Sequence, residues 1–302
     1  MSSILKIEFE KLRKTKSFWA IMLFLVFITS TVAITRSLEV GGSVGGINPA
    51  EPRAENGYFF EDNSAYAISL YNVWIGSISG DLFFTTIFYF ILPLAATLPF
   101  SFSLSDESKS GYLRQMTLKK GQMRYYFAKY IVTFTSGFLL AAIPLLINVI
   151  ITACYIPAYK PDPLEQLYSG QYYGQYLANI FYSEPFAFMI IFILIPGLFC
   201  GLWADLSMCL SFFIKNKFFV VIIPYLFLFF EKAFFDSLFS NRIALDLSPF
   251  YFMRGESSGN IVIVTIILIT MLGVTLFITW FRGWRDCLLY TSPSPRDRSV
   301  SR

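Results

Sequence analysis

Long runs of apolar residues recur along this chain and restrict what it can fold into. Several approach the roughly 20 residues that an α-helix needs to cross about 30 Å of hydrocarbon. Of the 302 residues, 55% are hydrophobic and only 15% are charged, whereas a soluble domain is about one-quarter charged. Within lipid the backbone must satisfy its own hydrogen bonds, which a helix does. The sequence therefore predicts an all-α, polytopic membrane protein.

Six apolar runs define the predicted transmembrane helices. The second run contains Pro93 and Pro99, which predicts a kinked helix that packs against protein. The fifth is apolar only over 218–230, about 20 Å of helix, before it meets Glu231 and Lys232. The predicted spans are 18–36, 82–104, 130–155, 185–214, 218–235 and 261–281.

The charged segment 1–17 precedes the first span and is typical of a helix lying at the membrane interface. One narrow apolar stripe is expected along it, with Ile4 outside the stripe, while Glu8 and Lys11 have the spacing of a helical ion pair. A signal-peptide n-region is the alternative, but the next apolar run is long for that and no small-x-small site follows it. The stripe consists of Leu5, Phe9 and Leu12.

The distribution of basic residues predicts the orientation. With the N-terminus inside, the inner segments hold fifteen Lys and Arg residues of 1–286 and the outer segments six. We therefore expect six crossings, with both ends cytoplasmic. The outer loops would contain Asp81 as a helix-capping acid, a tyrosine-faced interfacial helix, and a segment within 236–260 that dips back into the outer leaflet. The tyrosines of that helix are Tyr168, Tyr172 and Tyr176.

Several kinds of chemistry are excluded by composition. The chain contains no histidine, so zinc sites with histidine ligands and Ser/His or Cys/His catalytic arrangements are absent. No G-x-x-x-x-G-K-[ST] loop occurs, so the chain has no P-loop of its own. Three of its cysteines lie within apolar runs and are interpreted as core residues. We predict no catalytic, metal-binding or cofactor-binding residue, no nucleic-acid partner and no enzymatic activity.

Polar side chains inside the predicted spans form one group of candidate residues, namely Asp205, Asn148 and Glu231. An intramembrane carboxylate is costly and is therefore a functional candidate. Asp205 is either such a residue, with a proton-coupled role as a hypothesis, or a structural acid hydrogen-bonded to a neighbour such as Asn148. Glu231 with Lys232 is interpreted as an outer-rim pair or a gate.

The segment 106–129 is the longest stretch between two apolar runs that is both polar and basic. Ser105 is a candidate N-cap, and a helix from there would be stopped by Gly121. Such a helix would carry a small apolar patch and a basic face, which is typical of an interaction surface. A positive-inside loop lying on anionic lipid is the alternative. The patch consists of Tyr112, Leu113 and Met116.

This segment resembles the E-x-x-x-G-T-x-R…R…K signature of ABC-2-type permeases, the membrane subunits of ATP-binding-cassette exporters. The matching residues are Glu107, Gly111, Arg114, Arg124 and Lys129, with Tyr112 in place of the usual threonine. The charged N-terminal helix and the six-span layout of 1–286 are also similar to that family.

The resemblance implies a mechanism. Two permease chains, as a homodimer or with a sister permease, would pair with separate ATPase subunits in a bacterial cell membrane. ATP would be bound and hydrolysed on the partner, and an amphipathic or hydrophobic substrate would leave the cell past the second and fifth spans. The implied ATPase contacts are Glu107, Gly111, Arg114, Lys119 and Arg124. The alternative function is a non-transporting immunity or sensor protein that binds a peptide at its outer loops.

The C-terminal stretch CLLYTSPSPRD, 287–297, resembles the read-through translation of a sequencing adapter. We therefore expect 287–302 to be a non-native tail and assign 1–286 to the transmembrane domain. An ordinary disordered basic tail is the alternative.

Overall fold

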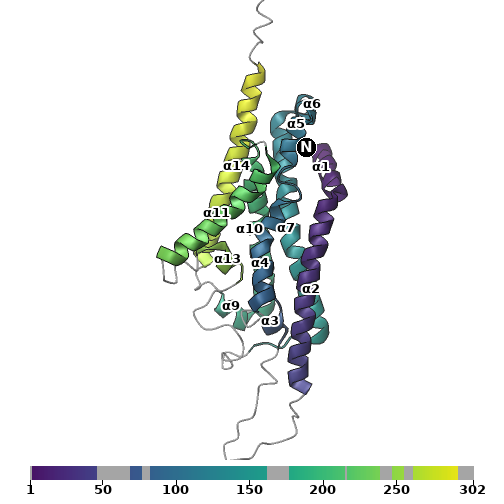
Figure 1. Ribbon diagram of the computed structural model, residues 1–302, viewed down its shortest axis with the longest axis vertical. Coiled ribbons are helices and arrows are strands. Elements are labelled where there is room, and N and C mark those ends of the chain that lie inside the picture. Colours follow the sequence, from purple (N-terminus) through teal and green to yellow (C-terminus); the bar gives the residue numbers. More distant parts are fainter. Residues whose placement is uncertain are drawn as a thin grey trace, which may run out of the picture.

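The computed structural model describes residues 2–45, 69–76, 82–161, 177–214, 216–238, 247–254 and 261–291. Every regular element within these ranges is a helix (Figure 1). Four helices are long and apolar enough to cross a membrane, which supports the predicted all-α membrane class. They are α2 (Lys16–Gly45), α7 (Gln122–Tyr155), α10 (Pro185–Leu210) and α14 (Ile261–Thr291). Asp81, the tyrosine-rich segment of 162–176 and the tail beyond Thr291 lie outside the described residues.

Helices α7 and α10 form the centre of the bundle, and α2, α4 and α14 pack around them. Glycines allow α7 and α10 to approach closely. A β-carbon on Gly137 of α7 would lie 2.4 Å from the carbonyl oxygen of Cys200, and one on Gly201 of α10 would lie 2.7 Å from the ring of Phe134. Both distances are far below van der Waals contact, so a larger residue would push the two helices apart.

The predicted span 82–104 is not one helix. Helix α4 (Leu82–Thr97) keeps Pro93 inside it, then a turn follows, and α5 (Ser103–Lys109) begins afterwards. Pro99 disfavours helical backbone at Leu98 and has no N–H to donate, so the helix ends before it. The 16 residues of α4 cover about 24 Å, less than the hydrocarbon thickness.

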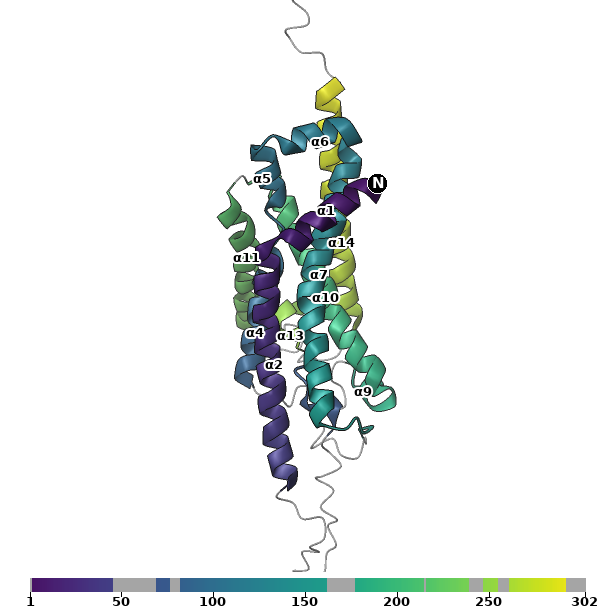
Figure 2. The same cartoon turned by 90° about the vertical axis from the view of Figure 1, so that its right-hand side faces the viewer.

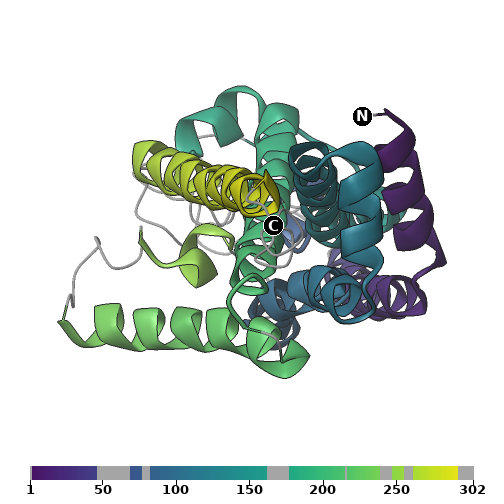
Figure 3. The same cartoon turned by 90° about the horizontal axis from the view of Figure 1, so that it is seen from above.

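Helix α11 (Lys217–Leu238) differs from the four spanning helices in direction and in charge. It runs obliquely away from the rest of the bundle (Figures 1 and 3). Lys217 begins it, and Glu231 and Lys232 interrupt its apolar sequence near the other end. Because α4 is short and α11 is interrupted by charges, neither is among the four helices that are long and apolar enough to cross a membrane, and the structure does not confirm the predicted count of six spans.

Other helices also begin or end at residues that differ from the predicted ones. Helix α7 begins at Gln122, about two turns before the predicted start at 130, and α14 continues to Thr291, beyond the predicted end at 281. The short helices α3 (Leu70–Val73) and α9 (Ala178–Ser183) lie at one end of the bundle, and α1 (Ser2–Lys14) and α5 at the other (Figure 1).

Candidate functional site

Helix α1 lies across one end of the bundle, at a steep angle to α2 (Figure 2). Its inward face consists of Ile4, Glu8 and Leu12, which are 1%, 0% and 4% exposed. The predicted stripe was therefore only partly correct, because Leu12 is buried but Phe9 is 38% exposed, and Ile4 faces inward. A buried carboxylate in the middle of that face requires partners from another helix.

The segment between α4 and α7 supplies some of those partners. The single helix predicted from Ser105 is broken at Gly111 into α5 and α6 (Tyr112–Lys120), because Gly111 adopts a left-handed conformation with φ of +74°. The predicted N-cap was wrong, since α5 already begins at Ser103. The predicted stop was correct: α6 ends at Lys120, and Gly121 has a φ of +85°.

Four charged side chains from α1, α5 and α7 meet in a closed ring, which we name the charge cluster: Glu8, Lys11, Glu107 and Lys129. Lys11 Nζ lies 2.7 Å from Glu8 Oε1 and 2.8 Å from Glu107 Oε1. Lys129 Nζ lies 2.9 Å from Glu8 Oε2 and 2.8 Å from Glu107 Oε1. Each ammonium group thus contacts both carboxylates, and the cluster carries no net charge.

Burial makes these contacts matter more than surface ion pairs would. The side chains of Glu8 and Lys129 are 0% exposed, that of Glu107 12% and that of Lys11 32%. The Tyr125 hydroxyl also donates a hydrogen bond to Glu107. Removing one partner from a buried ion pair typically costs about 3–5 kcal/mol, because the other charge remains desolvated.

Aromatic rings complete the surroundings of the two ammonium groups. Lys11 Nζ lies 4.1 Å from the ring centre of Tyr112, and Lys129 Nζ lies 4.5 Å from that of Phe100. A cation over a ring face is stabilised by the ring quadrupole. These rings come from the beginning of α6 and from the turn after α4, so aromatic side chains of two further segments surround the cluster.

The two cluster residues that lie outside the spanning helices and are partly accessible to solvent have shifted pKa values. Burial alone would raise the pKa of the Glu107 carboxyl, but Lys129 and Lys11 outweigh it and hold the pKa below its ordinary value. Burial would lower the pKa of the Lys11 ammonium, yet its bonds to Glu107 and Glu8 raise the pKa above its ordinary value. Both shifts favour the charged forms.

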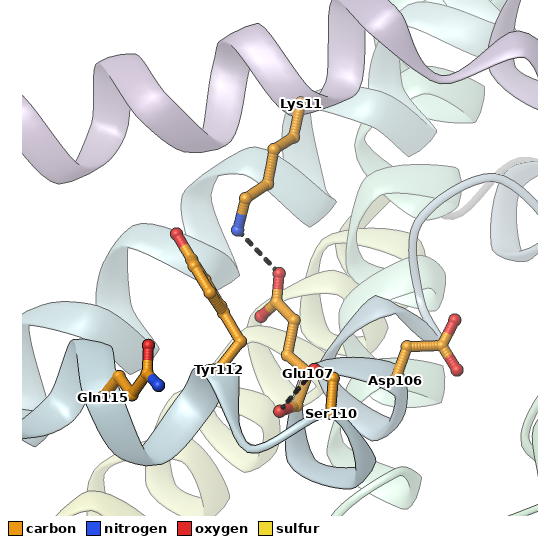
Figure 4. A pocket seen from close by; sticks show the side chains of 6 residues that line it. All are labelled: Lys11, Asp106, Glu107, Ser110, Tyr112 and Gln115. Atoms are coloured by element: carbon orange, nitrogen blue, oxygen red, sulfur yellow. Dashed lines mark hydrogen bonds and ion pairs between the residues drawn. The ribbon is translucent and has the colours of Figure 1, made fainter.

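A groove of about 490 Å³ opens beside the charge cluster, between α1 and the α5–α6 turn (Figure 4). Lys11 reaches into it from α1, and Glu107 and Tyr112 approach from the other side. Asp106, next to Glu107, turns elsewhere and pairs with Lys217 of α11 at 2.7 Å. Consecutive carboxylates of α5 therefore contact different helices. The groove is lined by Lys11, Asp106, Glu107, Ser110, Tyr112 and Gln115.

The structure separates the predicted ATPase-contact residues into two groups. Arg114 and Lys119 of α6 and Arg124 at the beginning of α7 are exposed, and Gly111 is exposed at the turn. Glu107 is instead engaged within the charge cluster. The predicted apolar patch also faces inward in part, since Leu113 and Met116 pack against a small core that contains Ile4 and Tyr125.

Glu8, Lys11 and Tyr125 were not predicted as site residues. The Glu8–Lys11 spacing and the position of Lys129 at the foot of an apolar run were visible in the sequence. A carboxylate between Ile4 and Leu12 on one helical face is the signal that would have placed Glu8 inside. Nothing in the sequence indicated that the two lysines share the same carboxylates.

The intramembrane polar residues do not come together. Asn148 Nδ2 donates to the carbonyl oxygen of Thr29 at 2.7 Å, and its Oδ1 accepts from the backbone N–H of Ile75 at 3.0 Å. Asn148 is therefore not the hydrogen-bonding partner of Asp205, which is fully buried on α10. Glu231 is half-buried on α11. In the described ranges, no group of three or more Cys, Asp or Glu side chains has the arrangement of a metal site.

Comparison with protein-family models, with curated proteins and with solved structures returned no match for this chain.

Proposed function

We propose that this chain is the membrane subunit of an ATP-binding-cassette exporter, and that a separate ATPase subunit docks on α6 and the groove beside it. The observation that carries this proposal is the charge cluster. It ties the exposed α5–α6 segment to α1 and to the base of α7, the central helix of the bundle. A displacement of α5 by a bound partner is therefore transmitted directly to a spanning helix.

The second carboxylate of α5 extends this connection. Asp106 pairs with Lys217 at the beginning of α11, and Lys217 Nζ also lies 5.2 Å from the ring centre of Phe102. One short helix thus contacts α1 and α7 on one side and α11 on another. In the proposed exporter, closure of the ATPases supplies the free energy, and this subunit supplies the element with two positions.

The proposal includes a topology of six crossings, with α4 and α11 as the two shorter ones and both termini in the cytoplasm of a bacterial cell. Helix α4 packs against α2, α7 and α10, which supports its place inside the bundle. Buried residues of α13 (Pro249–Phe252) support a segment that returns into the protein: the Phe250 ring stacks on Phe90 of α4 at 5.5 Å.

The partners and cargo follow from the same proposal. A second permease chain, identical or a sister, completes the path, and ATP binds on the ATPase. Exposed aromatic and aliphatic side chains on α11 and α14 suit lipid, a second chain or an amphipathic or hydrophobic substrate. They include Phe227, Phe230, Ile266, Ile269 and Phe277.

The proposal requires a neighbouring gene for an ATP-binding-cassette ATPase, and co-expression with that ATPase tests it. We expect the two proteins to co-purify, and we expect Arg114→Glu combined with Lys119→Glu to lower co-purification and substrate-stimulated ATP hydrolysis at least tenfold. Both side chains are exposed, so the variant should keep its fold. Lys160→Glu is the matched control, an exposed lysine just beyond the far end of α7.

Unchanged assembly and hydrolysis in the double variant would refute the docking site. Glu107 is unsuitable for this test, because its replacement would disturb the charge cluster as well as any contact. The alternative of a peptide-binding immunity or sensor protein places its site on outer loops that lie largely outside the described residues. It predicts normal peptide binding when no ATPase is present.

A further inference from the structure

Asp205 lies at the interface of α10, α7 and α14 and is 0% exposed. Neither carboxylate oxygen has a hydrogen-bonding partner in the described part of the chain. The Tyr130 hydroxyl of α7 lies near the carboxylate but does not reach hydrogen-bonding geometry with it. A buried carboxylate anion without a donor or a cation would cost several kcal/mol. Some ligand must therefore complete this site.

The nearby hydroxyl protons are already committed elsewhere. Thr275 Oγ1 lies 2.8 Å from the carbonyl oxygen of Met271 and 3.1 Å from that of Leu272. Carbonyl oxygens can only accept, so the single Thr275 proton points to the backbone of its own helix, and the shorter distance favours Met271. Tyr130 Oη lies 3.0 Å from Thr275 Oγ1. Since the Thr275 proton is used, Tyr130 is the donor in that bond. The Tyr130 proton therefore points away from Asp205, and its oxygen is left as an acceptor.

The protons of the neighbouring Cys209 thiol and Thr279 hydroxyl are also used in other hydrogen bonds. Thr279 Oγ1 donates to the carbonyl oxygen of Thr275 at 2.8 Å. Cys209 Sγ lies 3.6 Å from that same carbonyl oxygen and 3.6 Å from Thr279 Oγ1, so its proton also goes to α14. Among the described residues, the titratable groups Tyr130 and Cys209 interact with Asp205. The site thus offers Asp205 acceptors rather than donors.

The geometry points to a proton-binding site at Asp205, in which the neutral carboxylic acid turns towards α7 and donates to Tyr130 Oη. The proton comes from water and forms an O–H bond on one carboxylate oxygen. A directed relay then runs from Asp205 of α10 through Tyr130 of α7 to Thr275 of α14 and ends on the Met271 carbonyl. Proton binding joins three spanning helices, and this inference does not depend on an ATPase partner.

Close packing favours a proton over a hydrated ion. One turn from Asp205, Gly201 lies so near Phe134 that a β-carbon there would be 2.7 Å from the ring. The β-carbon of Ala204, the residue before Asp205, would lie 3.0 Å from one added to Gly137. Alkali ions bound by proteins usually take several oxygen ligands, whereas a proton requires only the acid and one acceptor.

Infrared difference spectroscopy of the purified full-length chain in lipid tests this inference. The parent minus Asp205→Asn spectrum at neutral pH should contain the carbonyl stretch of one neutral carboxylic acid, shifted in D₂O. The amide that Asp205→Asn introduces can still donate to Tyr130, so this variant should melt within about 3 °C of the parent, while Asp205→Ala should melt distinctly lower. Carboxylate bands in place of the neutral acid band would overturn the proposal, as would a sodium- or potassium-dependent band.

Tyr130→Phe provides a second test that keeps Asp205 and does not rely on the folding of the Asp205→Asn variant. Loss of the acceptor should move the acid carbonyl stretch to higher frequency without abolishing it. Thr279→Val, which removes a hydroxyl from the same interface but not from the relay, should leave the stretch where it is. A band unmoved by Tyr130→Phe would show that Asp205 does not donate to Tyr130.

Discussion

At the scale of single residues, the ion pairs of the charge cluster offset the cost of burying charged side chains and also specify how α1 packs. Two fully buried charged side chains, Glu8 and Lys129, are tolerated because each has an oppositely charged partner and because Glu107 and Lys11 close the ring. A hydrophobic contact would hold α1 in place as well, but it would specify its rotation and register less strictly. The ion pairs fix one position of α1 relative to α5 and α7.

Lys129→Met should therefore be strongly destabilising. The substitution keeps most of the side-chain volume but leaves Glu8 and Glu107 with Lys11 alone, and we expect a loss of about 3 kcal/mol or more in the free energy of unfolding. Thermal unfolding in detergent measures it. Lys119→Met, which removes an exposed lysine of α6, should stay within about 0.5 kcal/mol of the parent. Equal stability of the two variants would contradict the role assigned to Lys129.

The shifted pKa values predict how stability depends on pH. The folded-state pKa of Glu107 lies below the ordinary 4.5, so its contribution is present above pH 4.5 and is lost as pH falls through the lower folded value. The folded-state pKa of Lys11 lies above the ordinary 10.5, so its contribution is present below pH 10.5 and is lost as pH rises through the higher value. The cluster should be intact across the whole neutral range.

The difference in melting temperature between the parent and Glu107→Gln measures how the contribution of Glu107 to stability is lost in acid. It should be largest at neutral pH and shrink towards zero in acid. Gln115→Ala removes a neutral side chain from the same groove and should differ from the parent equally at every pH. A difference for Glu107→Gln that does not change with pH would count against the ionised carboxylate.

The sequence indicated Glu107 and the segment around it, but not the side chains that form ion pairs with the Glu107 carboxylate. Its exposed neighbours Arg114, Lys119 and Arg124 were recognised correctly as surface residues, since basic side chains in a polar segment rarely become buried. The same expectation of exposure failed for Glu8, which is charged but buried. The cost of burying its carboxylate is offset by Lys129, 121 positions further along the chain, a separation that no local pattern reveals.

At the scale of elements, helix breaks were harder to predict than helices. Apolarity identifies 82–104 as a membrane segment, but the backbone break after Thr97 follows from Pro99. Similarly, the break at Gly111 requires a left-handed residue, which glycine permits without demanding it. The result in both places is a change of chain direction that creates α5 and its two carboxylate contacts.

The close approach of α7 and α10 gives a prediction at this scale. Gly137→Ala should destabilise the protein by about 1–3 kcal/mol, because its β-carbon would meet the Cys200 carbonyl oxygen at 2.4 Å and backbone must shift. Gly273→Ala in α14 is the matched control. A β-carbon there meets nothing within 4 Å, so the substitution should be neutral or stabilising by up to about 1 kcal/mol. Thermal unfolding in detergent distinguishes the two, and a stable Gly137→Ala variant would contradict the tight interface.

At the scale of the whole molecule, the proposed topology places α6 and the C-terminal end of α7 on opposite sides of the membrane. We expect a membrane-impermeant maleimide to label Lys160→Cys in intact cells and Lys119→Cys only after the membrane is permeabilised. The four cysteines of the chain would first be replaced by alanine. Both lysines are exposed, so their labelling reports on the side of the membrane. Labelling of Lys119→Cys in intact cells would reverse the orientation.

The charge cluster also has a consequence in time. Glu8 is made 121 residues before Lys129, and at about 5–20 residues per second a ribosome needs on the order of ten seconds to cover that distance. Until then Glu8 has no Lys129 to pair with, so burying its carboxylate is unfavourable and α1 should stay at the membrane surface with this carboxylate in water. The first helix to be synthesised can thus take its final place only after the beginning of α7 has been made.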